Sequence, residues 1–218
     1  KNDGSAWCWG YGGHGQLGDG SKVDQTTPIA VKGLANAEAI TAGWHFTCAL
    51  KNDGSAWCWG LNDKGQLGNG STTTQATPVV VKGLANAKAI GAGPSHTCAL
   101  KNDGTVACWG AGKNGQLGDG NEIDQTTPVA VKGLANAEAI AAGAHFTCAL
   151  KNDGTVWCWG FNDHGELGDG TKTHRSTPVA VKGLGNAKAI AAGGHFTCAL
   201  KNDGSAWCWG YGGHGQLG

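Results

Sequence analysis

The chain repeats itself every 50 residues, and this period constrains its fold more than any other feature. The sequence Lys-Asn-Asp-Gly begins at Lys1, Lys51, Lys101, Lys151 and Lys201, and residues 201–218 are identical to residues 1–18. We therefore expect a single repeat array over 1–218, with full repeats at 1–50, 51–100, 101–150 and 151–200 and a partial repeat at 201–218. A period of this length fits a β-propeller blade of about four short antiparallel strands better than a helical repeat.

Composition agrees with an all-β chain and argues against several classes of partner. The 40 glycines suit tight turns and close backbone packing rather than long helices. The 16 basic and 16 acidic residues cancel, so the electrostatic signature of nucleic-acid binding is missing. No apolar run approaches the roughly 20 residues of a membrane-spanning helix, so we expect neither a nucleic-acid nor a membrane partner. Because the sequence contains no Met, we expect a processed protein or part of a longer one.

One repeat predicts four strands. Residues 27–32, with a proline near the start, and the alanine-rich residues 37–43 each predict a strand. Residues 46–50 and 55–60 flank Asn52-Asp53-Gly54, a strong hairpin signal that ends with glycine in the left-handed region. With this three-residue loop, Lys51 lies opposite Ser55 and Cys48 lies opposite Cys58. Residues 60–78 are punctuated by glycine and predict a surface loop.

The nine cysteines occupy only two positions of the repeat. Opposed strand positions bring Cβ atoms near disulfide distance, so we expect one disulfide in each hairpin. The expected pairs are Cys48 with Cys58, Cys98 with Cys108, Cys148 with Cys158, and Cys198 with Cys208. Cys8 has no upstream partner in the sequence and is expected to be unpaired. Buried free thiols are the alternative, and a zinc site is disfavoured because no Cys-x-x-Cys pair occurs.

The motif Gly-x-His-Phe-Thr-Cys-Ala-Leu-Lys-x-Asp-Gly-Thr-Val-Trp-Cys-Trp-Gly, followed by Gly-Gln-Leu-Gly-Asp-Gly and Thr-Pro-Val, resembles the repeat of the regulator of chromosome condensation family. The resemblance covers every copy. It implies a propeller whose sequence repeats are offset from its blades, so that strands from both ends can close the ring. The Trp-Cys-Trp-Gly variant is similar to the bacterial, exported branch.

The resemblance implies several functions. Nuclear members are exchange factors for a small GTPase and bind chromatin, which the cysteine pairs and the neutral charge argue against here. Plant photoreceptor members use tryptophans in Gly-Trp-Arg-His-Thr motifs, whereas Gly43-Trp44-His45-Phe46-Thr47 lacks the arginine and has no counterpart in the other copies. Secreted members include propeller inhibitors of β-lactamase that bind through loops on one face.

Differences among the copies concentrate in three loop regions, around residues 11–14, 21–25 and 44–46 of the repeat. Variable loops on a constant scaffold are where a repeat protein places partner contacts, although drift at permissive positions is the alternative. The candidate partner-binding residues are Tyr11, His14, Trp44, Leu61, Lys64, Lys113, Phe161, His164, Arg175 and Tyr211.

No arrangement of residues predicts catalysis, a cofactor or a metal site. The eight histidines lack metal-ligand spacing and a matched carboxylate pair, and structural hydrogen bonds explain them better. Asp19-Gly20-Ser21 is loosely similar to a calcium loop, but turn formation is the better explanation.

The sequence therefore predicts a disulfide-linked propeller, or part of one, that is not an enzyme and binds an unknown protein partner through its loops. An inhibitor of a secreted or periplasmic enzyme and a purely structural or engineered array are the alternatives. If the disulfides form, we expect the chain outside the cytosol, in an extracellular, periplasmic or cell-surface location. Residues 1–18 and 201–218 compete for one place in a closed ring, so three outcomes stay open: one copy is displaced, chains self-associate to complete a ring, or the chain is part of a longer array.

Overall fold

A computed structural model describes all residues, 1–218, and contains 17 β-strands and no helix. The strands are β1 (Trp7–Gly10), β2 (Gln25–Ala30), β3 (Ala37–Ala42), β4 (Phe46–Lys51), β5 (Ala56–Gly60), β6 (Gln75–Val80), β7 (Ala87–Ala92), β8 (His96–Lys101), β9 (Val106–Gly110), β10 (Gln125–Ala130), β11 (Ala137–Ala142), β12 (Phe146–Lys151), β13 (Val156–Gly160), β14 (Arg175–Ala180), β15 (Ala187–Ala192), β16 (Phe196–Lys201) and β17 (Ala206–Gly210). None of the chain forms a helix of the length and apolarity needed to cross a membrane.

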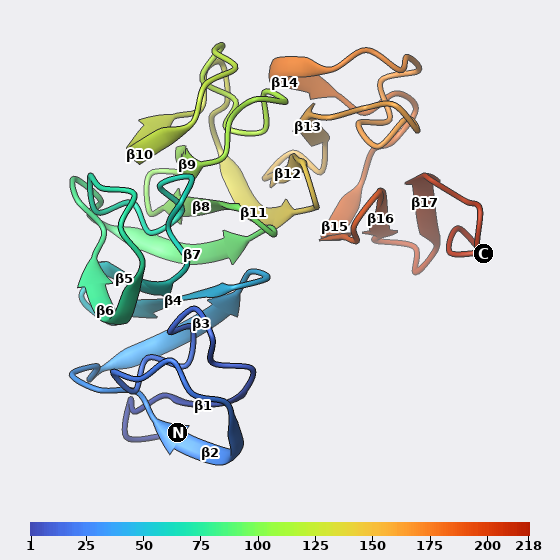
Figure 1. The fold of residues 1–218 in the computed structure, drawn as a ribbon. Helices are drawn as coiled ribbons and strands as arrows, with labels where there is room; N and C mark the ends of the chain where they lie inside the picture. Colours follow the sequence, from blue (N-terminus) through green and yellow to red (C-terminus); the bar gives the residue numbers. More distant parts are fainter.

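The strands form the blades of a β-propeller, arranged along an open arc (Figure 1). Three blades are complete four-stranded antiparallel sheets, in the orders β3-β4-β5-β6, β7-β8-β9-β10 and β11-β12-β13-β14. The two-stranded sheet β1-β2 and the three-stranded sheet β15-β16-β17 lie at the two ends of the arc. The innermost strands β3, β7, β11 and β15 contact one another in sequence and form the inner side of the arc. Each blade starts about 36 residues into a sequence repeat, so repeats and blades are offset.

The hairpin register follows the prediction from the sequence. Cys48 lies opposite Cys58, and the amide of Lys51 donates to the carbonyl of Ser55 at 2.9 Å. Gly54 has φ of 77°, the left-handed value that the three-residue loop requires. The same pairing recurs in the other three hairpins.

The outermost strand of the blade differs from its predicted bounds. The strand expected at residues 27–32 begins earlier, at Gln25, and ends at Ala30. Pro28 therefore lies inside the strand rather than near its start. The strand tolerates it because β2 is at the edge of its sheet and its pairing with β1 is irregular between Cys8 and Gly10. The loop before this strand is correspondingly shorter than the sequence suggested.

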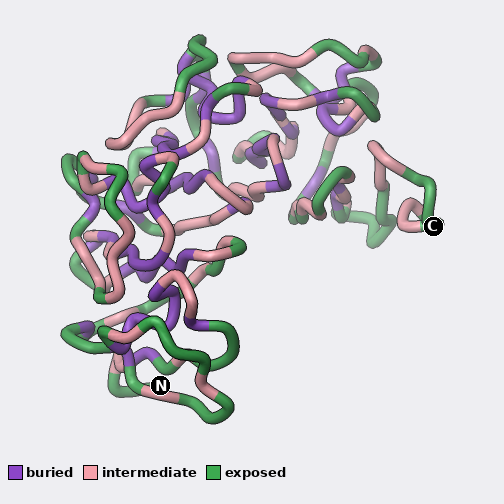
Figure 2. The backbone as a smooth tube through the Cα atoms, viewed as in Figure 1, coloured by how far each residue is buried: buried purple, intermediate pink, exposed green.

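The core lies between blades rather than within one sheet. One face of a blade carries its disulfide, and this face packs against a buried tryptophan of the next blade. In the layer between the first two complete blades, one buried cluster contains Cys48, Cys58 and Leu50 of the first blade and Trp109 and Ala99 of the second. The next layer repeats this arrangement with Trp159. Buried residues are concentrated in the complete blades, whereas β1 and β17 are mostly exposed or half-buried (Figure 2).

A disulfide joins the two strands of each of the four hairpins, at the cysteine pair that the register places opposite one another. The Cα–Cα distances of these pairs are 4.0–4.1 Å. Cys8 is free and half-buried. In each of the four blades other than the sheet β1-β2, the crosslink holds the β4-type and β5-type strands together independently of packing against neighbouring blades.

Candidate protein-interaction face

Adjacent blades are joined by one repeated hydrogen-bonding unit, here called a junction. In each junction, a loop carbonyl of one blade accepts two side-chain hydrogen bonds from the next blade. In the second junction, the carbonyl of Gln66 accepts from Trp109 Nε1 at 2.9 Å and from Thr97 Oγ1 at 3.0 Å. The carbonyls of the first, third and fourth junctions belong to Gln16, Gln116 and Glu166, with donor distances of 2.8–3.1 Å. Sequence reasoning missed this unit, because a backbone acceptor leaves no residue-type signal.

The junction fixes the loops that follow β1, β5, β9 and β13, and two different chemistries order these loops internally. Where the loop contains asparagine, as at Asn62, its side-chain nitrogen donates to two loop carbonyls and its oxygen accepts from the amide of Leu67. Where the same position is glycine, as at Gly12, the backbone amide donates to Asp24 instead. Both solutions give an ordered loop whose remaining side chains are free to vary.

The three variable regions of the repeat lie on one face and contact one another through aromatic and imidazole rings. At one end of the arc, Tyr11 and His14 lie with their ring centroids 6.0 and 4.7 Å from that of His45. At the other end, the ring of Phe161 lies 4.6 Å from that of His174 and 6.2 Å from those of His145 and His195. We call this surface the loop face.

His164 and Tyr211 extend the second group of rings. The ring of His164 lies 4.9 Å from that of Tyr211 and 5.9 Å from that of His195. The structure thus brings three of the predicted site residues, Phe161, His164 and Tyr211, around His195. For His195 itself, the sequence predicts only a structural hydrogen bond and no part in binding.

Trp44 is the most exposed large apolar side chain, at 73 %. It lines a pocket of about 430 Å³ where the innermost strands converge, together with Pro94, Ala144, Gly194 and His195. Position 44 of the repeat is thus occupied by a different residue in each copy, and all four copies line the same pocket. The most variable position of the repeat therefore lines a pocket at the centre of the arc.

The remaining predicted residues are more dispersed. Leu61 is half-buried, Lys113 is exposed, and Lys64 lies 4.0 Å from Asp124 of the next blade. Arg175 turns back to its own loop, where it donates to Asp169 at 3.0 and 3.1 Å. Its guanidinium group is therefore already paired within the chain, and it contributes less to an open surface than the sequence suggested.

Residues 19–21 form a turn of the kind expected from the sequence. Asp19 accepts hydrogen bonds from both the amide and the hydroxyl of Ser21. The structure contains no group of three or more His, Cys, Asp or Glu side chains that could hold a metal ion. The carboxylates of the hairpin loops also accept hydrogen bonds within their own turns. At Asp53, hydrogen bonds from Ser55 hold the pKa of the carboxyl group below its usual range.

Two buried titratable residues replace the side chain found in other copies. His96 occupies the position of Phe46, Phe146 and Phe196, is fully buried, and has Nε2 3.0 Å from the Thr147 hydroxyl oxygen. Burial, followed by the charge of His145, lowers the pKa of His96 to about 3. Its imidazole is therefore neutral over the physiological range.

Glu166 is the second replacement, and it is the only acidic residue at a position that is glutamine in the other four copies. The carboxylate is fully buried. Its Oε2 accepts from the amide of His164 at 2.9 Å, whereas Oε1 has no hydrogen-bond partner. His195 Nδ1 is 3.5 Å from Oε1. The single-letter change at position 166 was the sequence signal that could have identified this site.

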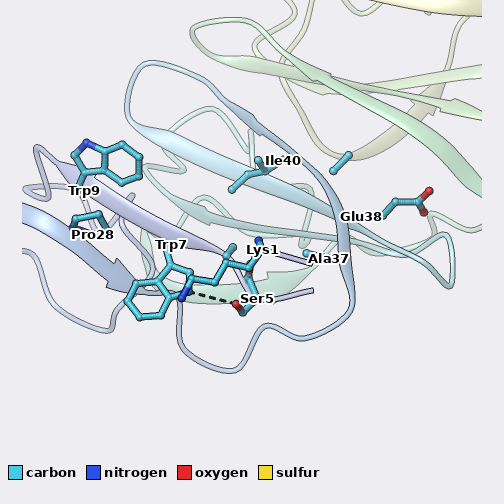
Figure 3. A pocket seen from close by; sticks show the side chains of 10 residues that line it. Lys1, Ser5, Trp7, Trp9, Pro28, Ala37, Glu38 and Ile40 are labelled. Carbon is cyan, nitrogen blue, oxygen red and sulfur yellow. Dashed lines mark hydrogen bonds between the residues drawn. The ribbon is translucent and has the colours of Figure 1, made fainter. Parts of the chain in front are cut away.

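A groove of about 580 Å³ lies beside β1 and is lined by Trp7, Trp9, Pro28 and Ile40 (Figure 3). Trp9 is 62 % exposed, whereas Trp59 at the same repeat position is fully buried. In a complete blade, the strand equivalent to β1 pairs with a β4-type strand on this side. The groove therefore occupies a position that a β-strand fills elsewhere in the molecule.

The whole chain, residues 1–218, matches the model of the RCC1-like domain. The chain belongs to the RCC1-like family. No curated protein matches its sequence. Among solved structures, yeast RCC1 (Prp20) bound to Kap60 is similar with a TM-score of 0.84 and 25 % identity, over 97 % of this chain and 53 % of that one.

Two further solved structures support the fold assignment. Prp20p from Saccharomyces cerevisiae, described with its binding to Gsp1p and histones, has a TM-score of 0.81 and 25 % identity, over 97 % of this chain and 54 % of that one. Human WBSCR16 has a TM-score of 0.83 and 24 % identity, over 93 % of this chain and 54 % of that one. The RCC1-like chain spans about half the length of these structures.

Proposed function

We propose that this RCC1-like chain is a non-catalytic scaffold that binds a protein partner through its loop face. The observation that carries the proposal is the convergence of the variable positions. Residues that differ between nearly identical repeats gather on one face, whereas the junction tryptophans, threonines and disulfides hardly change. Partner contacts fit such a surface because its side chains can vary without disturbing the scaffold.

The composition of the loop face supports a protein ligand. Tyr11, Trp44, Phe161 and Tyr211 offer aromatic surface of the kind enriched in binding hot spots. The pocket beside Trp44 is large enough for an apolar side chain of a partner. The two structures of yeast Prp20 are described with protein partners, Kap60 in one and Gsp1p and histones in the other. Those partners belong to the relatives, and the neutral charge of this chain favours a different one.

The proposed location is outside the reducing cytosol. Four disulfides at the centres of four blades are expected to persist in an extracellular, periplasmic or cell-surface environment. The partner is then a secreted or surface protein, and inhibition of a secreted enzyme is a narrower form of the same proposal.

A displayed random-peptide library selected on the immobilised chain tests the proposal. We expect selected peptides whose affinity falls at least about tenfold in a variant with Tyr11→Ser, Trp44→Ser and Phe161→Ser. The matched control changes exposed turn residues on the opposite face, with Asn52→Ser, Asn102→Ser and Asn152→Ser. Equal losses in the two variants, or no loss in the first, would contradict a loop-face site.

Self-association is a second candidate, favoured by the groove beside β1. Strand β16 of a second copy has the sequence of the strands that pair with β1-type strands in the complete blades, so β16 of a second copy, with its own β17 displaced, is the proposed occupant. Light scattering on the 218-residue chain should give the mass of two or more chains. A single-chain mass at every concentration would exclude this candidate and leave the loop-face proposal intact.

A further inference from the structure

The buried carboxylate of the fourth junction has three properties that no other junction combines. Glu166 replaces glutamine, its Oε1 lacks a donor, and its surroundings on the loop face are rings from His164, His195 and Tyr211. The corresponding residues of the second junction are Gln66, Lys64, Ser95 and Ala111.

The second junction shows how a glutamine side chain at this position can be satisfied at both ends. Gln66 Oε1 accepts from the amide of Lys64 at 2.9 Å, and Gln66 Nε2 donates to Asp63 at 3.2 Å. Glu166 keeps the first of these bonds, because Oε2 accepts from the amide of His164. It cannot make the second, since a carboxylate oxygen is an acceptor. Asp163 pairs with His174 at 2.9 Å instead.

A buried carboxylate oxygen without a donor costs free energy, so a cationic donor is the chemistry that this site lacks. His195 covers Oε1 at 3.5 Å, beyond good hydrogen-bonding distance, and its side chain is 46 % exposed. The imidazole therefore covers the carboxylate from the solvent side without occupying it. His195 also lines the central pocket, whereas Glu166 does not.

We propose that Glu166, His164, His195 and Tyr211 form a binding site for an arginine side chain of a protein partner. The guanidinium group donates to Glu166 Oε1 and packs its flat face against the rings of His164 and Tyr211, while His195 moves aside. Arginine fits better than lysine, because its planar group both donates to a carboxylate and stacks on rings. The inference rests on the proposed function, and it adds the chemistry of one residue that the partner presents.

Trp209 provides a local reporter of this site. Its indole Nε1 donates to the carbonyl of Glu166 at 2.8 Å, so its NMR signal senses changes at Glu166. The indole of Trp109, bonded to Gln66 in the second junction, is the internal control. Trp209→Phe assigns the reporter signal.

The test titrates the chain with the peptide acetyl-Gly-Arg-Gly-amide at low ionic strength, with the citrulline peptide as the neutral isostere. We expect a saturable shift of the Trp209 indole with the arginine peptide, no shift of the Trp109 indole, and at least about tenfold weaker binding of the citrulline peptide. Glu166→Gln should weaken arginine binding by about tenfold or more and leave the fold unchanged, because glutamine is the residue of the other copies. Three results would overturn the proposal: the citrulline peptide binds as tightly as the arginine peptide, the Glu166→Gln variant binds the arginine peptide as tightly as the parent, or the Trp209 indole shows no saturable shift.

A gain-of-function variant keeps the result independent of any loss of folding. Gln16→Glu places a carboxylate in the first junction beside His14 and His45, whose rings are 4.7 Å apart. It should add a second arginine-dependent shift, at the Trp59 indole that is bonded to Gln16. Library peptides that need the loop face but neither arginine nor Glu166 would overturn this inference and leave the proposed function standing. If the arginine peptide binds at Glu166 but the library yields no peptide, the inference stands and the proposed function is contradicted.

Discussion

The second and fourth junctions share a scaffold and differ in almost every side chain around it. The carbonyls of Gln66 and Glu166 accept the same pair of tryptophan and threonine donors, at 2.9 and 3.0 Å in one case and 2.8 and 3.1 Å in the other. The side chains on these two residues are an amide with both ends paired and a carboxylate with one oxygen unpaired.

This comparison explains how a nearly identical repeat can acquire a site. The contacts that hold blades together use a backbone carbonyl, which any residue at the position supplies. The side chain at the same position is then free to change without loss of the junction. Within a single residue, the backbone carbonyl therefore holds the blades together, and the side chain can change for recognition.

Removal of a junction tryptophan should have the largest effect. Trp109 is fully buried between blades and donates to Gln66, so Trp109→Ala should lower the free energy of unfolding by about 3–5 kcal/mol. Trp159→Ala in the third junction should cost the same, because the contacts are equivalent. Denaturant unfolding measures both. A difference of more than about 2 kcal/mol between them would show that the junctions are not a constant unit.

Removal of one disulfide should have the next largest effect. Cys98→Ala with Cys108→Ala opens a crosslink between residues ten apart and should cost about 2–3 kcal/mol. Replacement of Cys148 and Cys158 should give a similar loss, because the second pair has the same separation. Cys8→Ala is the control, since this thiol is unpaired. Thermal unfolding without reductant is the measurement, and no loss in the double variants would assign the blade's stability to packing alone.

His96 should make stability depend on pH in a window above that of the carboxylates. Its pKa is about 3 in the folded chain and about 6.5 when unfolded, so the unfolded state binds the extra proton as pH falls below 6.5. Stability should fall by about 1.4 kcal/mol per pH unit between roughly pH 6 and 4 from this group. His96→Phe, the residue of the other copies, should remove that slope. An unchanged slope in urea titrations at several pH values would show that another group is responsible.

The blade could be predicted from the sequence in detail, because its signals are local. Asn52-Asp53-Gly54 predicts the hairpin loop, and the loop length then fixes the register of Cys48 and Cys58. The bounds of the outermost strand were wrong, since the irregular pairing around Pro28 is set by the neighbouring strand rather than by the residues themselves.

The chemistry of the loop face could be predicted only in part. Comparison of the copies identified Phe161, His164 and Tyr211 as variable, but their meeting around His195 depends on how consecutive blades pack. The difference at Glu166 is visible in the sequence as one letter. Its burial and its unpaired oxygen are not, because both follow from contacts with the next blade.

The smallest expected effect separates the two junctions most directly. Glu166→Gln should raise the free energy of unfolding by about 1 kcal/mol, because the amide that replaces Oε1 can donate to Asp163 as Gln66 donates to Asp63. The reverse change, Gln66→Glu, should be more costly than Glu166→Gln is stabilising, since Ser95 stands where the fourth junction has His195 and no imidazole lies over the new carboxylate. Chemical denaturation at pH 7 compares the two variants with the parent. A loss of stability in Glu166→Gln would show that His195 already compensates the carboxylate, and it would make the fourth junction a structural ion pair rather than a site kept open for a ligand.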